Sequence, residues 1–303
     1  MVLPNFLMIG APKAGTSAIY YYLKQHPQIY MSPLKEPHFF ALENHSLNFQ
    51  GPGDKDRFRD AVTQLEDYEK LFANVSREVA IGEASTTYLS SETAPLRIKH
   101  YIPDVKLIAI LRNPVDAAYA SFLHLVRDGD EPLADFGLAL EAEEKRVRQN
   151  WEGIWHYQRR GFYAEQLERY FQHFDRNQLK VYRYDDFKAN PNVVLRDIFE
   201  FLEVDPGFMP DMSAKYNVSA MPKNPLLNKM MVKPNPLKSA LNMALPKPMR
   251  SEIATRLKHW NFQEKKPPLS PELRDQLHQN YREDMLKLQD LIQQDLSEWL
   301  ERV

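Results

Sequence analysis

The chain of 303 residues contains no cysteine, so disulfide bonds and thiolate chemistry are excluded outright. A reducing compartment is the expected environment, and we therefore predict a cytoplasmic protein. The first residues lack the basic segment and long apolar run of a signal peptide. No stretch reaches the apolar length of a membrane span, so we expect a soluble chain without one.

An excess of positive charge is also missing, because the formal net charge is −2. General nucleic-acid binders usually carry a basic excess, so no nucleic-acid partner is expected. Any anionic ligand has to be met by a local cluster of positive side chains. The composition does not indicate an oligomeric state.

Apolar runs typical of strands alternate with helical patterns over the first two thirds of the chain. Strands are predicted at residues 6–9, 28–31, 79–82, 105–111 and 179–182, with helices between them. This alternation favours an α/β fold with a central parallel β-sheet flanked by helices on both faces.

The alternating pattern breaks at about residue 205. Residues 205–250 are rich in proline and lysine, which is typical of a lid or of a cofactor- or substrate-binding loop. A surface excursion with short helices explains this composition equally well. Ser270-Pro271-Glu272 then begins a long helix. We expect one domain over residues 1–303: an α/β core at 1–204, this loop, and C-terminal helices at 251–303 packed on the core.

The most informative segment is FLMIGAPKAGTS, at residues 6–17. An apolar strand leads into small residues with Lys13, and Thr16 and Ser17 open a helix. Loop N–H groups and a helix N-terminus then point at one spot and form an anion cradle. The segment resembles a nucleotide-binding P-loop, but Gly15 stands where the lysine before the magnesium-binding hydroxyl belongs. A phosphosulfate fits better than a metal-bound triphosphate, and no metal is expected. A simple helix cap is the alternative.

A second anion site is predicted where the apolar strand at 105–111 ends in Arg112. A Walker B strand would end in aspartate there and hold a metal, whereas arginine offers a planar fork for a second phosphate. Ser121 lies on the following helix and is a candidate hydroxyl for the same anion. A structural ion pair for Arg112 and an idle helix serine remain alternatives.

A third group of polar residues, Glu36 and His38, follows the second predicted strand. Either side chain could act as general base toward an acceptor hydroxyl, which is typically worth ~10²–10⁴ in rate. A loop salt bridge for Glu36 and a packed, hydrogen-bonded His38 are the structural alternatives.

Together these motifs resemble sulfotransferases that use 3′-phosphoadenosine-5′-phosphosulfate (PAPS), in the branch of the bacterial and heparan-sulfate enzymes. Gly10–Ser17 is similar to the family's 5′-phosphosulfate loop and Leu111–Asp116 to its 3′-phosphate motif. Glu36–Phe40 is similar to a Glu-x-His-Phe-Phe segment whose glutamate is taken as the catalytic base. Gly161-Phe162-Tyr163 and the stretch from Tyr281 to Trp299 add to the likeness.

The resemblance implies a P-loop NTPase-like sulfotransferase fold and sulfuryl transfer to an acceptor hydroxyl, less readily to an amine. The donor would be PAPS, released as 3′,5′-adenosine bisphosphate (PAP), and the acceptor a small-molecule, lipid-like or polyketide-like compound. Glu36 would be the base, His38 the second candidate, and Lys13 would stabilise the leaving group. The family's serine, eight residues after the arginine, is Ala120 here, so Ser121 is offered instead. The implied cofactor contacts are Pro12, Lys13, Ala14, Gly15, Thr16, Ser17, Arg112, Ser121, Tyr163 and Lys223.

Two other functions stay open on sequence grounds. A P-loop kinase for a small molecule would need magnesium and a Walker B aspartate, and Arg112 at the strand end argues against it. A non-catalytic nucleotide-binding module could carry the same Lys13 and Glu36, so the sequence does not separate it from an enzyme.

Overall fold

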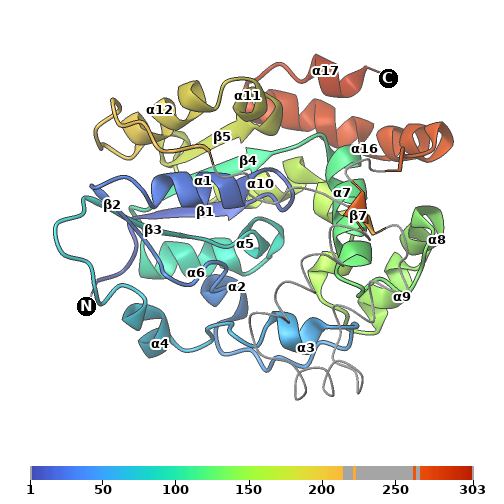
Figure 1. Ribbon diagram of the computed structural model, residues 1–303, viewed down its shortest axis with the longest axis horizontal. Coiled ribbons are helices and arrows are strands. Elements are labelled where there is room, and N and C mark those ends of the chain that lie inside the picture. Colours follow the sequence, from blue (N-terminus) through green and yellow to red (C-terminus); the bar gives the residue numbers. More distant parts are fainter. Residues whose placement is uncertain (1, 214–220, 223–261, 264–266, 302–303) are drawn as a thin grey trace.

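The computed structural model describes residues 2–213, 221–222, 262–263 and 267–301, and its core is a five-stranded sheet (Figure 1). All four strand pairings are parallel, and the strand order is β2-β3-β1-β4-β5. The predicted α/β fold with a central parallel sheet is therefore confirmed. The strands are β1 (Phe6–Gly10), β2 (Ile29–Met31), β3 (Ala80–Ala84), β4 (Lys106–Leu111) and β5 (Leu179–Arg183).

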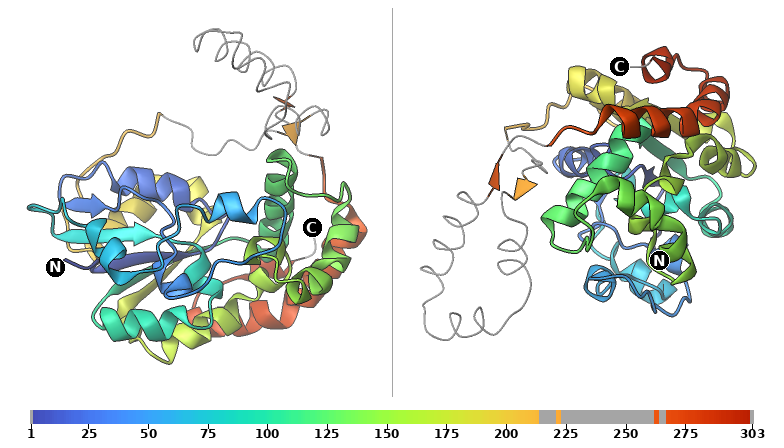
Figure 2. Two further views of the ribbon diagram at one scale, coloured as in Figure 1. Left: turned by 90° about the horizontal axis from the view of Figure 1, so that it is seen from below. Right: turned by 90° about the vertical axis from the view of Figure 1, so that its right-hand side faces the viewer.

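Helices cover both faces of the sheet. The helices α1 (Thr16–Leu23) and α12 (Pro191–Phe201) lie on one face, and α6 (Ala94–Tyr101) and α10 (Tyr163–Phe171) on the other (Figure 2, left). Because neither face meets water, central strands of such a sheet are apolar along their whole length. β1 accordingly reads FLMIG and is buried at every position.

The strand order creates a switch point between β1 and β4. After β1 the chain continues to β2 at one edge of the sheet, whereas after β4 it continues to β5 at the opposite edge. In open parallel sheets, ligands bind in the crevice that these diverging connections leave at the carboxyl ends of the strands. The loops after β1 and β4 are the two that carry Lys13 and Arg112.

The C-terminal helix α16 (Pro271–Ile292) packs on α10, and Ser270 caps it by accepting a hydrogen bond from the N–H of Leu273 at 3.2 Å. An ion pair of 3.0 Å between Arg274 and Asp116 connects α16 to the helix that begins at Pro114. The remaining described elements are α2 (Phe39–Leu42), α3 (Asp54–Arg57), α4 (Leu65–Lys70), α5 (Thr87–Ser90), α7 (Pro114–Arg127), α8 (Phe136–Glu141), α9 (Glu143–Arg148), η1 (Gly153–Trp155), η2 (Arg159–Gly161), η3 (Arg176–Gln178), α11 (Tyr184–Ala189), α17 (Ser297–Leu300) and the antiparallel pair β6 (Met221–Pro222) and β7 (Phe262–Gln263).

Much of the predicted lid or binding loop at residues 205–250, with its candidate cofactor contact Lys223, lies outside the described residues. Within the described ranges, no helix combines the length and apolarity that crossing a bilayer requires.

The close packing of β1 against β3 can be tested by a substitution at Gly82. Gly82 lies opposite Phe6, and a Cβ on Gly82 would come within 2.4 Å of the Phe6 ring. We expect Gly82→Ala to lower the free energy of unfolding by ~1–3 kcal/mol, because the ring has to move within a packed core. Chemical denaturation measures this change. Gly153→Ala is the matched control, since a Cβ there meets nothing within 4 Å. Equal stability of both variants would contradict the packing described.

Candidate active site

A cavity of about 610 Å³ lies at the carboxyl edge of the sheet. Loops that follow all five strands reach it, so it occupies the crevice at the switch point between β1 and β4. Its charged and polar lining includes Lys13, Thr16, Ser17, Lys35, Glu36, His38, Arg57, Thr86, Thr87, Arg112, Ser121, His124, Glu152, Arg160, Tyr184 and Lys188.

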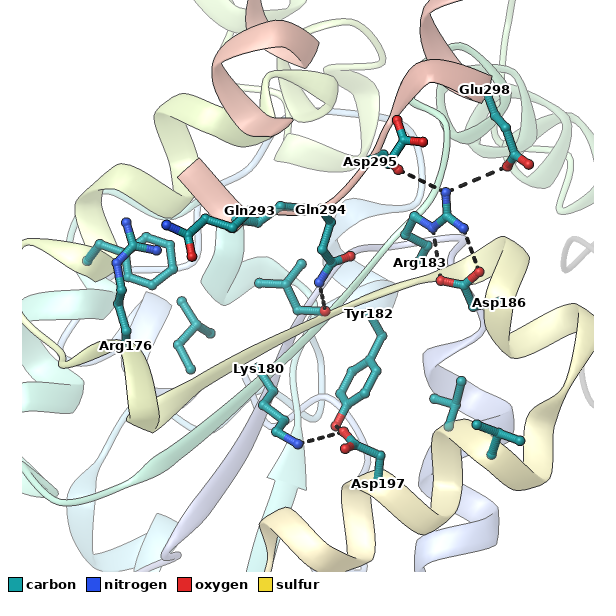
Figure 3. A pocket seen from close by; sticks show the side chains of 16 residues that line it. Arg176, Lys180, Tyr182, Arg183, Asp186, Asp197, Gln293, Gln294, Asp295 and Glu298 are labelled. Carbon is teal, nitrogen blue, oxygen red and sulfur yellow. Dashed lines mark hydrogen bonds and ion pairs between the residues drawn. The ribbon is translucent and has the colours of Figure 1, made fainter. Parts of the chain in front are cut away.

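A larger cavity of about 850 Å³ lies along the outer edge of β5, away from these loops (Figure 3). Its charged side chains are already paired with one another: Arg183 contacts Asp186 at 2.7 Å, and Lys180 contacts Asp197 at 2.7 Å. Gln294 donates a hydrogen bond of 2.8 Å to the carbonyl of Val181 and so covers part of the strand edge. We therefore take the smaller cavity as the candidate active site.

The loop after β1 has the backbone geometry of an anion cradle. Lys13 and Gly15 have left-handed φ angles of 63° and 89°, and α1 begins directly after them. The N–H groups of Gly15, Thr16 and Ser17 have no hydrogen-bond acceptor among the described residues. Such unpartnered donors at a helix N-terminus are a fitting site for phosphate-like oxygens. Glycine is needed at 15, since a Cβ would lie 3.1 Å from the Tyr184 ring at a left-handed φ.

Arg112 lies beside this loop, as the sequence predicts. Its Nη1 donates a hydrogen bond of 3.2 Å to the carbonyl oxygen of Lys13, and its guanidinium lies 5.1 Å from the centre of the Tyr184 ring. Burial, together with the charge of Lys13, lowers the pKa of His124 in the same cavity to about 3. The imidazole is therefore neutral at physiological pH, and the positive charge beside the cradle is that of Lys13 and Arg112.

The other predicted cofactor contacts divide into two groups. Pro12, Gly15, Thr16, Ser17 and Ser121 line the cavity, whereas Ala14 and Tyr163 are buried and do not belong to its lining. The Ser121 hydroxyl donates a hydrogen bond of 2.9 Å to the carbonyl of Ala117. A hydroxyl has a single proton to donate, so in this conformation Ser121 offers no donor to a phosphate.

Glu36 presents its carboxylate to the cavity from the loop after β2. Its Oε1 accepts a hydrogen bond of 2.7 Å from Lys35 Nζ, and its Oε2 accepts one of 2.9 Å from the N–H of Thr86. Burial alone raises the pKa of Glu36, but the charge of Lys35 and these hydrogen bonds outweigh it and hold the pKa below its ordinary value. Glu36 is consequently an ionised proton acceptor at neutral pH.

His38 lies beside Glu36 but is more enclosed. Its side chain is 9% exposed against 25% for Glu36, and its Nδ1 lies 2.9 Å from Thr87 Oγ1. Burial, aided by the charges of Lys35 and Arg160, lowers the pKa of His38 to about 4, so the ring is neutral. Glu36 and His38 have left-handed φ angles of 62° and 61°. Non-glycine residues adopt this conformation at a cost of ~1–3 kcal/mol each, which is common at functional sites.

Glu83 is completely buried in β3 and is connected through Ser85 to the loop that contains His38. Its carboxyl group accepts hydrogen bonds from Tyr68 Oη at 3.3 Å and from Ser85 Oγ at 2.9 Å. Ser85 Oγ in turn accepts a hydrogen bond of 3.1 Å from the N–H of His38. Burial raises the pKa of Glu83 to about 7. The group therefore changes charge close to physiological pH while it holds the backbone of the site.

Sequence reasoning missed four residues of the cavity that bear on its chemistry: Arg57, Thr86, Arg160 and Tyr184. Thr86 and Tyr184 follow β3 and β5, so the rule that strand ends meet at one edge of a sheet could have found them. Arg57 and Arg160 come from α3 and η2, which lie far from any strand end in sequence. No sequence pattern marks them.

These loops form a P-loop-like α/β site that is lined by the cations Lys13 and Arg112 and by the carboxylate of Glu36, which pairs with Lys35. Comparison with known proteins agrees with that class. The family model for the sulfotransferase domain matches residues 3–289. The chain belongs to the sulfotransferase family.

Individual relatives support the same assignment. A solved structure of a sulfotransferase from Alicyclobacillus acidocaldarius has a TM-score of 0.79, at 34% identity over 99% of this chain and 100% of that one. The predicted P-loop-like sulfotransferase fold is thereby confirmed. Bifunctional heparan sulfate N-deacetylase/N-sulfotransferase 4 from Mus musculus is 30% identical over 68% of this chain and 23% of its own length. Carbohydrate sulfotransferase 15 from Homo sapiens is 26% identical over 67% of this chain and 44% of its own length. The chain thus spans less than half the length of these two relatives.

The buried carboxyl group of Glu83 predicts a pH-dependent stability. Its pKa is raised in the folded state, so its stabilising share is complete below about pH 4.5 and is lost as the pH rises through about 7. We expect the free energy of unfolding of the wild type to fall by about 3 kcal/mol from this group over that window. Glu83→Gln should flatten the slope, whatever its absolute stability. Denaturant titrations at several pH values measure the slope, and the same slope in both proteins would contradict a raised pKa.

Proposed function

We propose that this domain transfers a sulfuryl group from PAPS to an acceptor hydroxyl. The observation that carries the proposal is the joint lining of one cavity by the Lys13 loop, Arg112 and an ionised Glu36. The donor is an anion at two separated positions, its 5′-phosphosulfate and its 3′-phosphate. A cavity lined by two cations and one ionised carboxylate suits such a donor and the attack on its sulfur.

The residues present fit the donor at both ends. The unpartnered N–H groups of Gly15, Thr16 and Ser17, with Lys13, would hold the phosphosulfate. Arg112 would hold the 3′-phosphate, since its planar fork matches a phosphate and its contact with Tyr184 fixes the plane. PAPS, when bound, supplies the sulfuryl group.

The acceptor hydroxyl is deprotonated by Glu36 as its oxygen forms a bond to sulfur. In this transfer the bond between sulfur and the departing bisphosphate oxygen would break, and that oxygen would keep the electron pair. Lys13 and the loop N–H groups stabilise the negative charge that builds on it. One well-placed donor of this kind is typically worth ~10²–10³ in rate, or roughly 3–4 kcal/mol.

Glu36 is the preferred base on grounds of access. Its side chain is the more exposed of the two candidates, and its carboxylate is held toward the cavity by Thr86. His38 is neutral and so able to take a proton, but its Nδ1 is already within hydrogen-bond distance of Thr87. His38 remains the second candidate.

The proposal also covers the domain bounds, the cellular location and the class of acceptor. We keep residues 1–303 as one domain in the cytoplasm, with a small-molecule, lipid-like or polyketide-like hydroxyl compound as acceptor. The mouse relative is named as a heparan sulfate N-sulfotransferase, so an amine remains the second acceptor class.

Donor binding is tested by thermal unfolding with PAP, with AMP, and with ATP plus magnesium. We expect PAP alone to raise the midpoint by a few degrees, because a ligand at a hundred times its dissociation constant adds about 2.7 kcal/mol of stability. AMP lacks the 3′-phosphate that Arg112 would bind and should shift the midpoint less. A shift with ATP and magnesium only would favour a P-loop kinase instead.

Variants of Glu36 and Arg112 distinguish the proposed base from the proposed donor-binding residue. Glu36→Gln keeps the shape of the side chain and should retain PAP affinity while kcat falls by ~10²–10⁴, since the proton acceptor is lost. Arg112→Ala should mainly weaken PAP binding. Calorimetry with PAP and transfer of labelled sulfate from PAPS measure both. Normal turnover in Glu36→Gln would remove this residue from the role of base, and His38→Gln would then be the next variant to assay.

A further inference from the structure

Arg160 lines the candidate active site, yet its guanidinium makes no hydrogen bond or ion pair with any other described residue. Its Nε atom is buried and has no partner. Glu152 and Glu36 are near enough to act on its charge, but neither forms an ion pair with it. A buried guanidinium N–H without an acceptor is costly unless a ligand supplies one.

Three other cations around the cavity, Lys35, Arg57 and Arg112, have protein partners. Lys35 contacts the carboxylate of Glu36 at 2.7 Å, and Arg57 contacts Asp130 at 2.9 Å. Arg112 bonds to the loop carbonyl of Lys13. Arg57 nevertheless has a second buried donor, its Nε, that is unsatisfied in the same way as that of Arg160. The cavity thus holds two arginines with unused donors besides the cations of the proposed donor site.

Arg160 is held in place by its own backbone. The N–H groups of Gln158 and Arg159 both donate to the carboxylate of Glu143, at 2.8 and 3.0 Å. Tyr281 on α16 donates from its hydroxyl to the carbonyl of Gln158 at 2.9 Å. Gly161 follows directly and lies against the same tyrosine, because a Cβ there would come within 2.6 Å of the ring. The turn is therefore fixed from two sides.

The neighbouring arginine shows the contrast. Arg159 is exposed and pairs with Glu144 at 2.7 Å on the outside of the molecule. Two consecutive arginines on one short 3₁₀ turn thus point in different directions. One completes a surface ion pair, and the other is directed into the cavity that contains Glu36.

We propose that Arg160, with Arg57 as second donor, binds an acidic group of the acceptor, a carboxylate or another oxyanion. The inference rests on the proposed sulfotransferase function and specifies the acceptor as a hydroxyl compound with a negative charge near the reacting oxygen. Arginine suits this task because its planar fork contacts two oxygens at once. The charge of Arg160 reaches Glu36, so the acidic group and the reacting hydroxyl belong to one small region of the ligand.

The first test uses inorganic sulfate as the oxyanion probe and needs no knowledge of the acceptor. PAP is added to saturation so that the Lys13 loop and Arg112 are occupied, and sulfate is titrated in by calorimetry. We expect the wild type and Arg159→Gln to bind sulfate and Arg160→Gln to bind it at least tenfold more weakly. Arg159→Gln is the matched control, because it removes an adjacent arginine charge outside the cavity.

Arg160→Lys refines the test, since it keeps the charge but not the fork. It should recover part of the sulfate affinity, and all variants should keep the PAP affinity of the wild type. Equal sulfate affinity in Arg160→Gln, or no saturable sulfate binding in the wild type, would overturn the inference. A tenfold loss of PAP affinity in Arg160→Gln would also overturn it and place Arg160 on the donor. If no variant binds PAP, the proposed function fails, whereas sulfate binding that depends on Arg160 without PAP still supports the present inference.

Turnover provides the second readout. Hydroxyl compounds are assayed as pairs that differ only in a carboxylate or its carboxamide. The wild type should prefer the acid of a pair by at least tenfold in kcat/KM, and Arg160→Gln should remove this preference. Preference for the amides in the wild type would contradict an acidic acceptor.

Discussion

The parallel pairing of β1 with β4 is the constraint on which the site depends. It brings together the loops that begin at Gly10 and Arg112, so that Arg112 bonds to the carbonyl of Lys13 across 99 residues of sequence. Neither cation could hold a two-ended anion alone. The two strands pair from Phe6 opposite Lys106 to Met8 opposite Ile108, and the register shifts before Gly10, which lies opposite Ala109. The ends of both strands therefore lie side by side where Lys13 and Arg112 follow them.

Two glutamates in and next to the cavity, Glu36 and Glu83, differ in their state of ionisation. At the cavity, the Glu36 carboxylate stays ionised because Lys35 and the backbone of Thr86 support it. One strand away, Glu83 is buried among hydroxyl groups and its pKa is raised to about 7. Two glutamates in adjacent loops and strands therefore have opposite shifts in pKa, for reasons of environment alone. Glu36 is therefore ionised at the cavity, whereas Glu83 accepts the hydrogen bond of Ser85, which in turn holds the backbone N–H of His38.

The fold and the meeting of Lys13, Glu36 and Arg112 at one cavity were largely predictable, because their signals are local. Apolar strands followed by Lys13, Glu36 or Arg112 can be recognised in sequence, and parallel strands deliver their ends to one edge. Tyr163 shows the limit of this approach: its motif is recognisable, but the side chain is buried behind the cavity wall. Arg57 and Arg160 reach the cavity only through the packing of α3 and η2. Such contacts between distant segments leave no periodicity or spacing that a single sequence could reveal.

Tyr281 and Glu143 fix η2 by hydrogen bonds to the backbone of residues 158 and 159. Lys13 and Arg112 follow strand ends, whereas Arg160 belongs to a short segment that is anchored on α9 and α16. Substitutions in those segments alter the outer wall of the cavity without disturbing the sheet register. The division lets natural selection change what is modified while the chemistry of modification is inherited intact.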